Sequence, residues 1–166
     1  MFKLGPLKKM TDEEKYRYML ILLKGQLSSE QDEIANLSNA SAIVMTCVDK
    51  LNWAGFYILR GKELVLGPFQ GLPACNRIQM GKGVCGTSLA NRTTQKIEDV
   101  HVFPGHIACD EASRSELVIP IVKNDVPYGV LDLDSPYVGR FTELEEKYLI
   151  KFVEVLNKYI NWQNIL

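Results

Sequence analysis

Three of the four cysteines lie in segments rich in glycine or proline, where side chains could do redox chemistry. Cys75 ends GPFQGLPAC, Cys85 lies in GKGVCGT, and Cys109 lies in FPGHIACDE. Loops can bring distant cysteines together, and loop thiols are accessible for redox reactions. We therefore expect any bridge among them to be transient and redox-active. Cys47, on the apolar stripe of an expected helix, is predicted to be core packing.

Cys109 is followed directly by two acids, Asp110 and Glu111. A nucleophilic cysteine reacts as its thiolate, which positive neighbours favour and acids do not. The residues alone therefore leave open which reaction would use a cysteine among acids.

A zinc site made of Cys75, Cys85, Cys109 and His106 is an alternative, because zinc binds thiolates and imidazoles. The spacing of Cys75 and Cys85 lacks the close pairing found in zinc ribbons. Zinc binding therefore remains an alternative to redox chemistry for these cysteines.

Two carboxylates alternate with leucines in the run GVLDLDSP. Residues two apart in a strand share a face, so Asp132 and Asp134 point together if Leu131 and Leu133 enter a core. Neighbouring carboxylates repel, and a desolvated one can retain its proton near neutral pH. The other interpretation is a solvated polar face.

Trp53 and Tyr57 share a face of another expected strand in the same way. They are either core aromatics or a box whose ring faces hold an apolar or cationic ligand.

The composition excludes several classes of protein. A net charge of -1 and a pI near 6.1 do not favour nucleic-acid binding. The longest apolar runs, 19–23 and 117–122, are far shorter than the roughly 20 residues that span a membrane. No secretory signal is recognisable, so we expect a cytoplasmic protein.

Three pairs of residues predict helix starts, because Ser or Thr followed three residues later by Glu or Gln can form a capping box. The pairs are Thr11/Glu14, Ser28/Gln31 and Thr142/Glu145. We expect the first helix to end near Lys24, since Gly25 can adopt the left-handed conformation.

Period-two patterns between the helices predict strands. The expected strands are 53–60, 63–69, 95–98, 117–122 and 128–134. Helices at both ends of a mostly antiparallel central sheet predict an α+β fold in one domain, 1–166, with a flexible N-terminal arm over 1–10.

The segment 52–136 resembles the free methionine-(R)-sulfoxide reductases, which are built on a single GAF domain. The resemblance rests on six motifs in the same order: NWAGFY, LVLGPFQGLPAC, GKGVCGTSLA, EDVHVFPGHIACD, SRSELVIPI and GVLDLDSP. It implies a GAF fold whose terminal helices form the helical layer, which is often the dimer contact.

The resemblance also implies roles for eight residues. Cys109 attacks the sulfoxide, Cys75 is the favoured partner for the resulting disulfide, and Cys85 is a further resolving thiol. Trp53 and Tyr57 line the substrate pocket, and its acidic wall is formed by Glu116, Asp132 and Asp134. One of these acids donates a proton and the cluster attracts the substrate's ammonium group.

The expected activity is thus reduction of free methionine-(R)-sulfoxide, with thioredoxin as reductant and no bound metal or organic cofactor. We expect no nucleic-acid or membrane partner, and a homodimer is consistent with the helical layer. The alternative function is a non-catalytic GAF module that senses a small molecule, since a fold alone does not fix function.

Overall fold

The computed structural model describes residues 5–107 and 109–165 and contains one antiparallel sheet between two unequal layers. The strands are β1 (Trp53–Arg60), β2 (Glu63–Gln70), β3 (Arg77–Gln79), β4 (Gln95–Ile97), β5 (Ser115–Lys123) and β6 (Val126–Ser135). Their order is β3-β2-β1-β6-β5-β4, and every neighbouring pair is antiparallel. The expected α+β architecture is confirmed.

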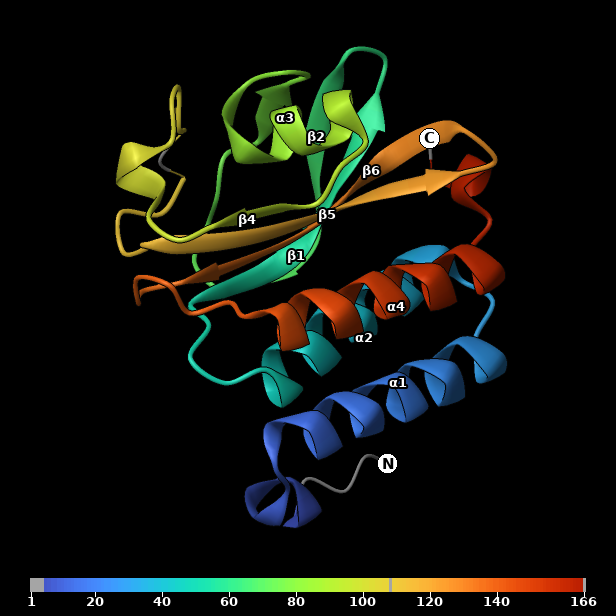
Figure 1. Ribbon diagram of the computed structural model, residues 1–166. Coiled ribbons are helices and arrows are strands. Elements are labelled where there is room, and N and C mark those ends of the chain that lie inside the picture. The colour runs from blue at the N-terminus through green and yellow to red at the C-terminus, as the bar shows by residue number, and fades with distance from the viewer. Residues whose placement is uncertain (1–4, 108, 166) are drawn as a thin grey trace.

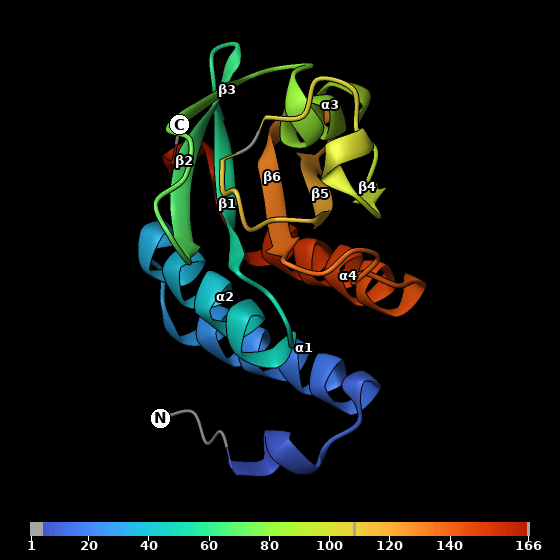
Figure 2. The same ribbon diagram turned by 90° about the vertical axis from the view of Figure 1, so that its left-hand side faces the viewer.

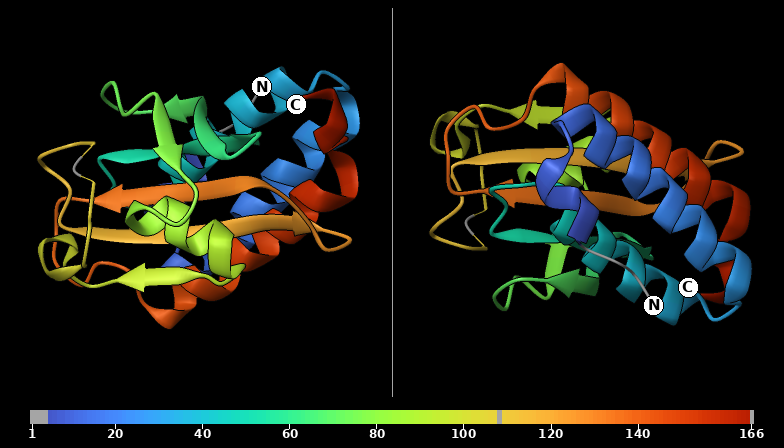
Figure 3. Two further views of the ribbon diagram at one scale, coloured as in Figure 1. Left: turned by 90° about the horizontal axis from the view of Figure 1, so that it is seen from above. Right: turned by 90° about the horizontal axis from the view of Figure 1, so that it is seen from below.

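Three long helices cover one face of the sheet and a short helix covers the other. The helices are α1 (Asp12–Ser29), α2 (Glu33–Cys47), α3 (Gly83–Asn91) and α4 (Glu143–Tyr159), with the 3₁₀ helices η1 (Gly5–Lys9), η2 (Val100–Val102) and η3 (Trp162–Asn164). Helices α2 and α4 lie on the sheet and α1 packs beneath both (Figure 1). Helix α3 lies across β5 and β6 on the opposite face (Figure 3, left).

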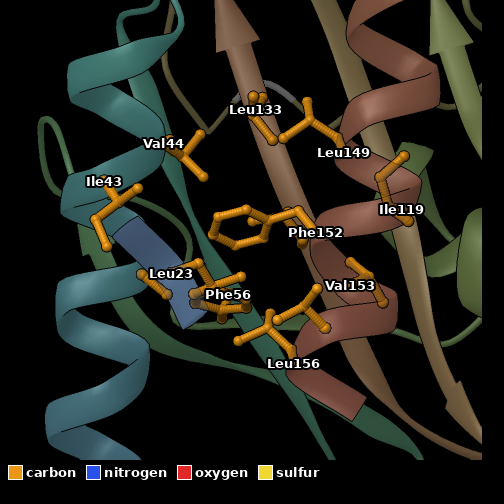
Figure 4. Packing of buried hydrophobic residues seen from close by; sticks show 14 of the residues in the cluster. Leu23, Ile43, Val44, Phe56, Ile119, Leu133, Leu149, Phe152, Val153 and Leu156 are labelled. Carbon is orange, nitrogen blue, oxygen red and sulfur yellow. The ribbon is translucent and has the colours of Figure 1, made fainter. Parts of the chain in front are cut away.

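The main core fills the space between the helical layer and the sheet. Phe152 and Leu156 of α4 point toward Phe56 of β1, Val44 of α2 and Leu23 of α1 (Figure 4). A second, smaller core lies under α3 on the other face and includes Trp53, Tyr57, Val84, Leu89, Val118 and Val130. The period of two along each strand divides its side chains between these cores.

Two of the three expected helix starts are confirmed. Thr11 with Glu14 and Thr142 with Glu145 form capping boxes at the starts of α1 and α4. The expected hairpins are confirmed as well. The turn between β5 and β6 has positive φ at both Asn124 (52°) and Asp125 (60°), as residues that tolerate the left-handed region allow.

The predicted boundary between the first two helices is wrong. Helix α1 continues past Gly25 to Ser29, because Leu27 beyond the glycine is buried in the core, and a glycine inside a helix costs only about 1 kcal/mol. Ser28 is inside α1, where its hydroxyl donates to Lys24 O, and α2 is instead capped by Asp32, which accepts from Ala35 N.

Helix α3 and strand β3 are absent from the sequence prediction, which placed Cys85 in a loop. That placement is wrong, because Cys85 lies in α3 and is buried. Cys47 is buried in the main core, as expected.

Of the expected N-terminal arm, residues 5–9 form η1 with Leu7 buried, and residues 1–4 lie outside the described part. None of the helices in the described ranges has the length and apolar composition needed to cross a membrane.

Candidate active site

Three acids on β5 and β6 project to the face of the sheet opposite the long helices. Glu116 pairs with Asp134 across the two strands, and Asp132 lies two residues before Asp134 on β6, opposite Val118. Leu131 and Leu133 point into the main core, which confirms that the two aspartates share the other face. Glu116 and Asp132 are only 6% and 5% exposed, so the solvated-face interpretation is wrong for Asp132.

An aromatic stack lies beside these acids on β1. The rings of Trp53 and Tyr57 are stacked with centroids 5.8 Å apart, and Phe69 stacks on the other side of Trp53 at 5.3 Å. Gly55 permits this arrangement, because a Cβ there would lie 2.8 Å from the Trp53 ring and 2.3 Å from the Phe69 Cβ. The close contact fixes the stack against the sheet.

Cys75 and Cys109 form a disulfide across 34 residues of sequence, with their Cα atoms 5.2 Å apart. Cys75 follows β2, and its carbonyl accepts a hydrogen bond of 3.0 Å from the Tyr57 hydroxyl. Cys109 lies between η2 and β5, in a segment that passes over the ends of β1 and β6 (Figure 2). Because these two sulfurs are bonded to each other, they are not available as zinc ligands in this state.

Asp110 anchors the segment that carries Cys109. Its carboxylate accepts hydrogen bonds from Asn52 Nδ2 at 2.7 Å and from the Ala112 backbone amide at 2.9 Å. Asn52 also donates to Ser113 Oγ at 3.0 Å. Asp110 therefore faces the protein and holds the loop after Cys109 in place.

A small cavity connects the disulfide to the acids. It is lined by Tyr57, Ile78, Gly83, Val84, Cys85, His106, Ile107, Cys109, Asp110, Ser113, Glu116, Asp132 and Asp134. Its volume is about 30 Å³, which is room for about two water molecules. Trp53 lies behind Tyr57 and does not line it. Six of the eight expected site residues therefore line the cavity, and the other two adjoin it, Cys75 through its disulfide with Cys109 and Trp53 through its ring contact with Tyr57.

The environment of Glu116, Asp132 and Asp134 favours their protonated forms. Burial raises the pKa of Asp132 from 3.8 to about 7. Burial, and then the charges of Asp132 and Asp134, raise the pKa of Glu116 well above its usual value. Burial and the charge of Asp132 do the same for the pKa of Asp134, although Ser113 opposes the shift through a hydrogen bond. Among the described residues no lysine or arginine lines the cavity, so protons are its main counter-charges.

Cys85 and His106 are uncharged neighbours of this acid cluster. The Cys85 thiol lies 3.8 Å from Glu116 Oε1, and burial followed by the Asp132 and Glu116 charges raises its pKa well above the usual value. His106 Nε2 lies 3.9 Å from Glu116 Oε2, and burial lowers the pKa of His106.

Sequence reasoning missed Asn52 and Ser113 as site residues and could not place His106. Asn52 begins NWAGFY and Ser113 begins SRSELVIPI, so both are present in the motifs that carry the family resemblance. Polar residues at the ends of strands are common, and no local sequence pattern predicts the contact that Asn52 and Ser113 make across the sheet.

Comparisons with known proteins agree with this geometry. The GAF domain model matches residues 26–160. The free methionine-R-sulfoxide reductase of Escherichia coli is 51% identical over 134 residues, which cover 81% of each chain. The protein of the same name from Saccharomyces cerevisiae is 40% identical over 157 residues, covering 90% of this chain and 87% of that one.

A solved structure is also similar over nearly the whole chain. The free methionine-R-sulfoxide reductase of Neisseria meningitidis, in complex with its substrate, matches with a TM-score of 0.89 and 37% identity, covering 94% of each chain. This chain therefore belongs to the GAF domain family and, within it, to the free methionine-R-sulfoxide reductases.

Proposed function

We propose that this protein reduces free L-methionine-(R)-sulfoxide to L-methionine with its own cysteines. The observation that carries the proposal is a disulfide whose Cys109 lines the same small cavity as the buried Glu116 and Asp132 and the half-buried Asp134. A non-catalytic ligand-binding GAF module would need neither a cysteine pair nor proton-rich acids at that position.

The reaction follows from these groups. The Cys109 thiolate attacks the sulfoxide sulfur and forms a sulfur–sulfur bond. That bond and the substrate sulfur–oxygen bond then break as the oxygen bonds to the Cys109 sulfur, which leaves Cys109 as a sulfenic acid and releases methionine. The oxygen gains a proton, which a protonated carboxyl of the cavity supplies as general acid. Glu116 and Asp134 are our candidates for the donor.

The Cys75 thiol then condenses with the sulfenic acid, forming the disulfide and releasing water. The sulfoxide is thereby reduced by two electrons, and the two thiols are oxidised by two. The disulfide seen here corresponds to the end of this sequence. Cys85 is the further resolving thiol in our proposal, although its buried position in α3 and raised pKa make it a slow nucleophile.

The acids also select the substrate. Asp132 and Asp134 attract the ammonium group of a free amino acid, which a residue inside a peptide lacks. Tyr57 lines the cavity with its ring, and Trp53, stacked behind it, fixes the Tyr57 ring. Direct contact between Trp53 and the substrate remains a prediction.

An external dithiol must reduce the disulfide after each turnover by thiol–disulfide exchange. We propose thioredoxin in this role and the cytoplasm as the compartment, where thiols are kept reduced. A homodimer through the helical layer is a further proposal, which size-exclusion chromatography with light scattering would test.

A single-turnover assay tests the cysteine roles. Reduced protein freed of reductant is mixed with free methionine-(R)-sulfoxide, and methionine is counted per chain. Wild type and Cys75→Ser should each give about one methionine, with Cys75→Ser retaining a sulfenic acid that dimedone traps. Cys109→Ser should give none. Cys47→Ala is the matched control, because Cys47 lies in the other core. Methionine from Cys109→Ser at the wild-type level would overturn the assignment.

The acetylated substrate tests the role of the acids. N-acetyl-methionine-(R)-sulfoxide has no ammonium group, so its kcat/KM should be lower by roughly tenfold or more, which is the scale of one preorganised charge interaction. Equal kcat/KM for the two substrates would contradict recognition of the ammonium group.

A further inference from the structure

Cys85, Glu116 and Asp132 form a group whose chemistry the proposed reaction does not fully use. One ligand atom from each residue, a sulfur and two carboxylate oxygens, lies within 4.8 Å of the other two, and all three residues are buried. Cys85 comes from α3, Glu116 from β5 and Asp132 from β6, so the group joins the short helix to the sheet.

One of the carboxylate oxygens has no partner. Asp132 Oδ1 is buried without a hydrogen bond to any described residue, and Asp132 lines the cavity. A buried oxygen of this kind is costly unless something satisfies it. A bound cation is one way to satisfy it.

We propose that these three residues bind one divalent transition-metal ion of the zinc type. A thiolate with carboxylates, and an imidazole where available, is a ligand set that zinc accepts. Zinc bonds of about 2.0–2.3 Å place tetrahedral ligands roughly 3.5 Å apart. Cys85 Sγ and Glu116 Oε1 are already 3.8 Å apart, and no pair among the three atoms exceeds 4.8 Å. His106, with Nε2 at 3.9 Å from Glu116 Oε2, is the candidate fourth ligand.

The acidic lining of the cavity also favours binding of a divalent cation. Asp110 and Asp134 also line it, and no lysine or arginine does so among the described residues. On binding, the Cys85 thiol and any protonated carboxyl of Glu116 and Asp132 give up their protons to solvent, and their sulfur and oxygen atoms become metal ligands. Cys85 remains a free thiol while Cys75 and Cys109 are joined, so the site is available in the disulfide form.

The metal would occupy the space between Cys109 and the acids, so we expect zinc to compete with the substrate. This competition rests on the proposed function, whereas binding of the metal does not. The site also differs from a zinc site made of Cys75, Cys85, Cys109 and His106, because two of those sulfurs are oxidised in the form to be tested.

Cobalt titration of the disulfide form tests the binding directly. Co²⁺ bound to a thiolate gives an intense sulfur-to-cobalt charge-transfer absorption, and Zn²⁺ added afterwards should displace it. We expect one Co²⁺ per chain with this absorption in wild type and in Cys47→Ala. Cys85→Ser should lose the absorption, and its Co²⁺ affinity should fall by about tenfold or more, as for loss of a metal contact.

Asp132→Asn provides a second variant that retains every cysteine. Its Co²⁺ affinity should fall by a similar factor while the sulfur-to-cobalt absorption of the remaining bound metal persists. The thermal unfolding midpoint without metal establishes that each variant is folded. Wild-type protein that binds no Co²⁺, or binds it without the charge-transfer absorption, would overturn the proposal. So would unchanged binding by both Cys85→Ser and Asp132→Asn.

Discussion

Buried acids on opposite sides of the sheet favour opposite protonation states: Glu145 in the helical layer, and Glu116 with Asp132 in the cavity. In the helical layer, Glu145 accepts hydrogen bonds from Arg140 at 2.9 Å, the Thr142 amide at 2.8 Å and the Tyr16 hydroxyl at 2.6 Å. Burial opposes its ionisation, but these bonds outweigh burial and lower the pKa of Glu145 to about 2. On the other side, burial raises the pKa of Glu116 and Asp132.

The difference lies in the partners, because both groups are almost fully buried. Glu145 has a guanidinium and three other donors, so its charge is compensated and it joins α4 to α1. Glu116 has a second carboxylate, a neutral thiol and a neutral imidazole nearby. The first arrangement stabilises the fold, and we propose that the second holds protons for the reaction at the expense of stability.

The largest expected effect comes from removing Arg140, the cation that pairs with Glu145. Arg140→Met leaves Glu145 buried and unpaired, which should lower the free energy of unfolding by about 3–5 kcal/mol in urea titrations. Turnover per folded molecule should stay at the wild-type value. Adding Glu145→Gln should restore part of the loss, since it removes the unpaired charge. A loss below about 1 kcal/mol would show that Glu145 does not depend on Arg140.

The next effect is on the reaction itself. Glu116→Gln removes a proton donor but leaves a neutral side chain of the same size, so turnover should fall by roughly tenfold or more. Asp132→Asn should have a similar effect. The unfolding free energy of both variants should stay near or above the wild-type value.

Glu145→Gln is the matched control for the two site variants. It should leave steady-state turnover unchanged while lowering the free energy of unfolding. If Glu116→Gln and Asp132→Asn both turn over at the wild-type rate, the cavity acids are structural only.

The contributions of Asp132 and Glu145 to the free energy of unfolding should change with pH in opposite directions. The pKa of Asp132 is raised from 3.8 to about 7, so the stability it provides is complete below pH 4 and is lost as the pH rises toward 7. The pKa of Glu145 is lowered from 4.5 to about 2, so its stability is present above pH 4.5 and is lost as the pH falls toward 2. Urea titrations at several pH values should show Asp132→Asn flattening the first slope and Glu145→Gln the second. A wild-type slope retained by either variant would refute the corresponding assignment.

The smallest effect is expected at the edge of the cavity. Asp110→Asn keeps only one of the two side-chain oxygens that accept from Asn52 and from the Ala112 amide, so one of these two bonds is lost. The first-turnover rate should fall by less than about tenfold, on the scale of one hydrogen bond. An effect as large as that of Glu116→Gln would instead place Asp110 among the reacting groups.

The sequence predicted every described strand except β3, and the shared face of Asp132 and Asp134, because a period of two is local information. Leu131, Asp132, Leu133 and Asp134 alternate visibly, and the structure places them on alternate faces. The capping boxes at Thr11 and Thr142 are local in the same sense and are confirmed.

The errors come from features that tertiary packing decides. Gly25 could end a helix, but burial of Leu27 extends it. Helix α3 is short and rich in glycine, which is typical of a loop, and it is its packing over β5 and β6 that makes this segment a helix. The cation beside Glu145 and the absence of one beside Glu116 depend on contacts between distant segments, which no local pattern reports.

The protonation of Glu116 and Asp132 at neutral pH tests the central claim most directly. Nuclear magnetic resonance of protein with ¹³C-labelled Asp and Glu carboxyls follows each group through a pH titration. We predict at least one protonated carboxyl at pH 7 that is absent from Glu116→Gln, and a Glu145 signal that stays ionised down to about pH 2. Ionised carboxyls at both Glu116 and Asp132 at pH 7 would contradict the account.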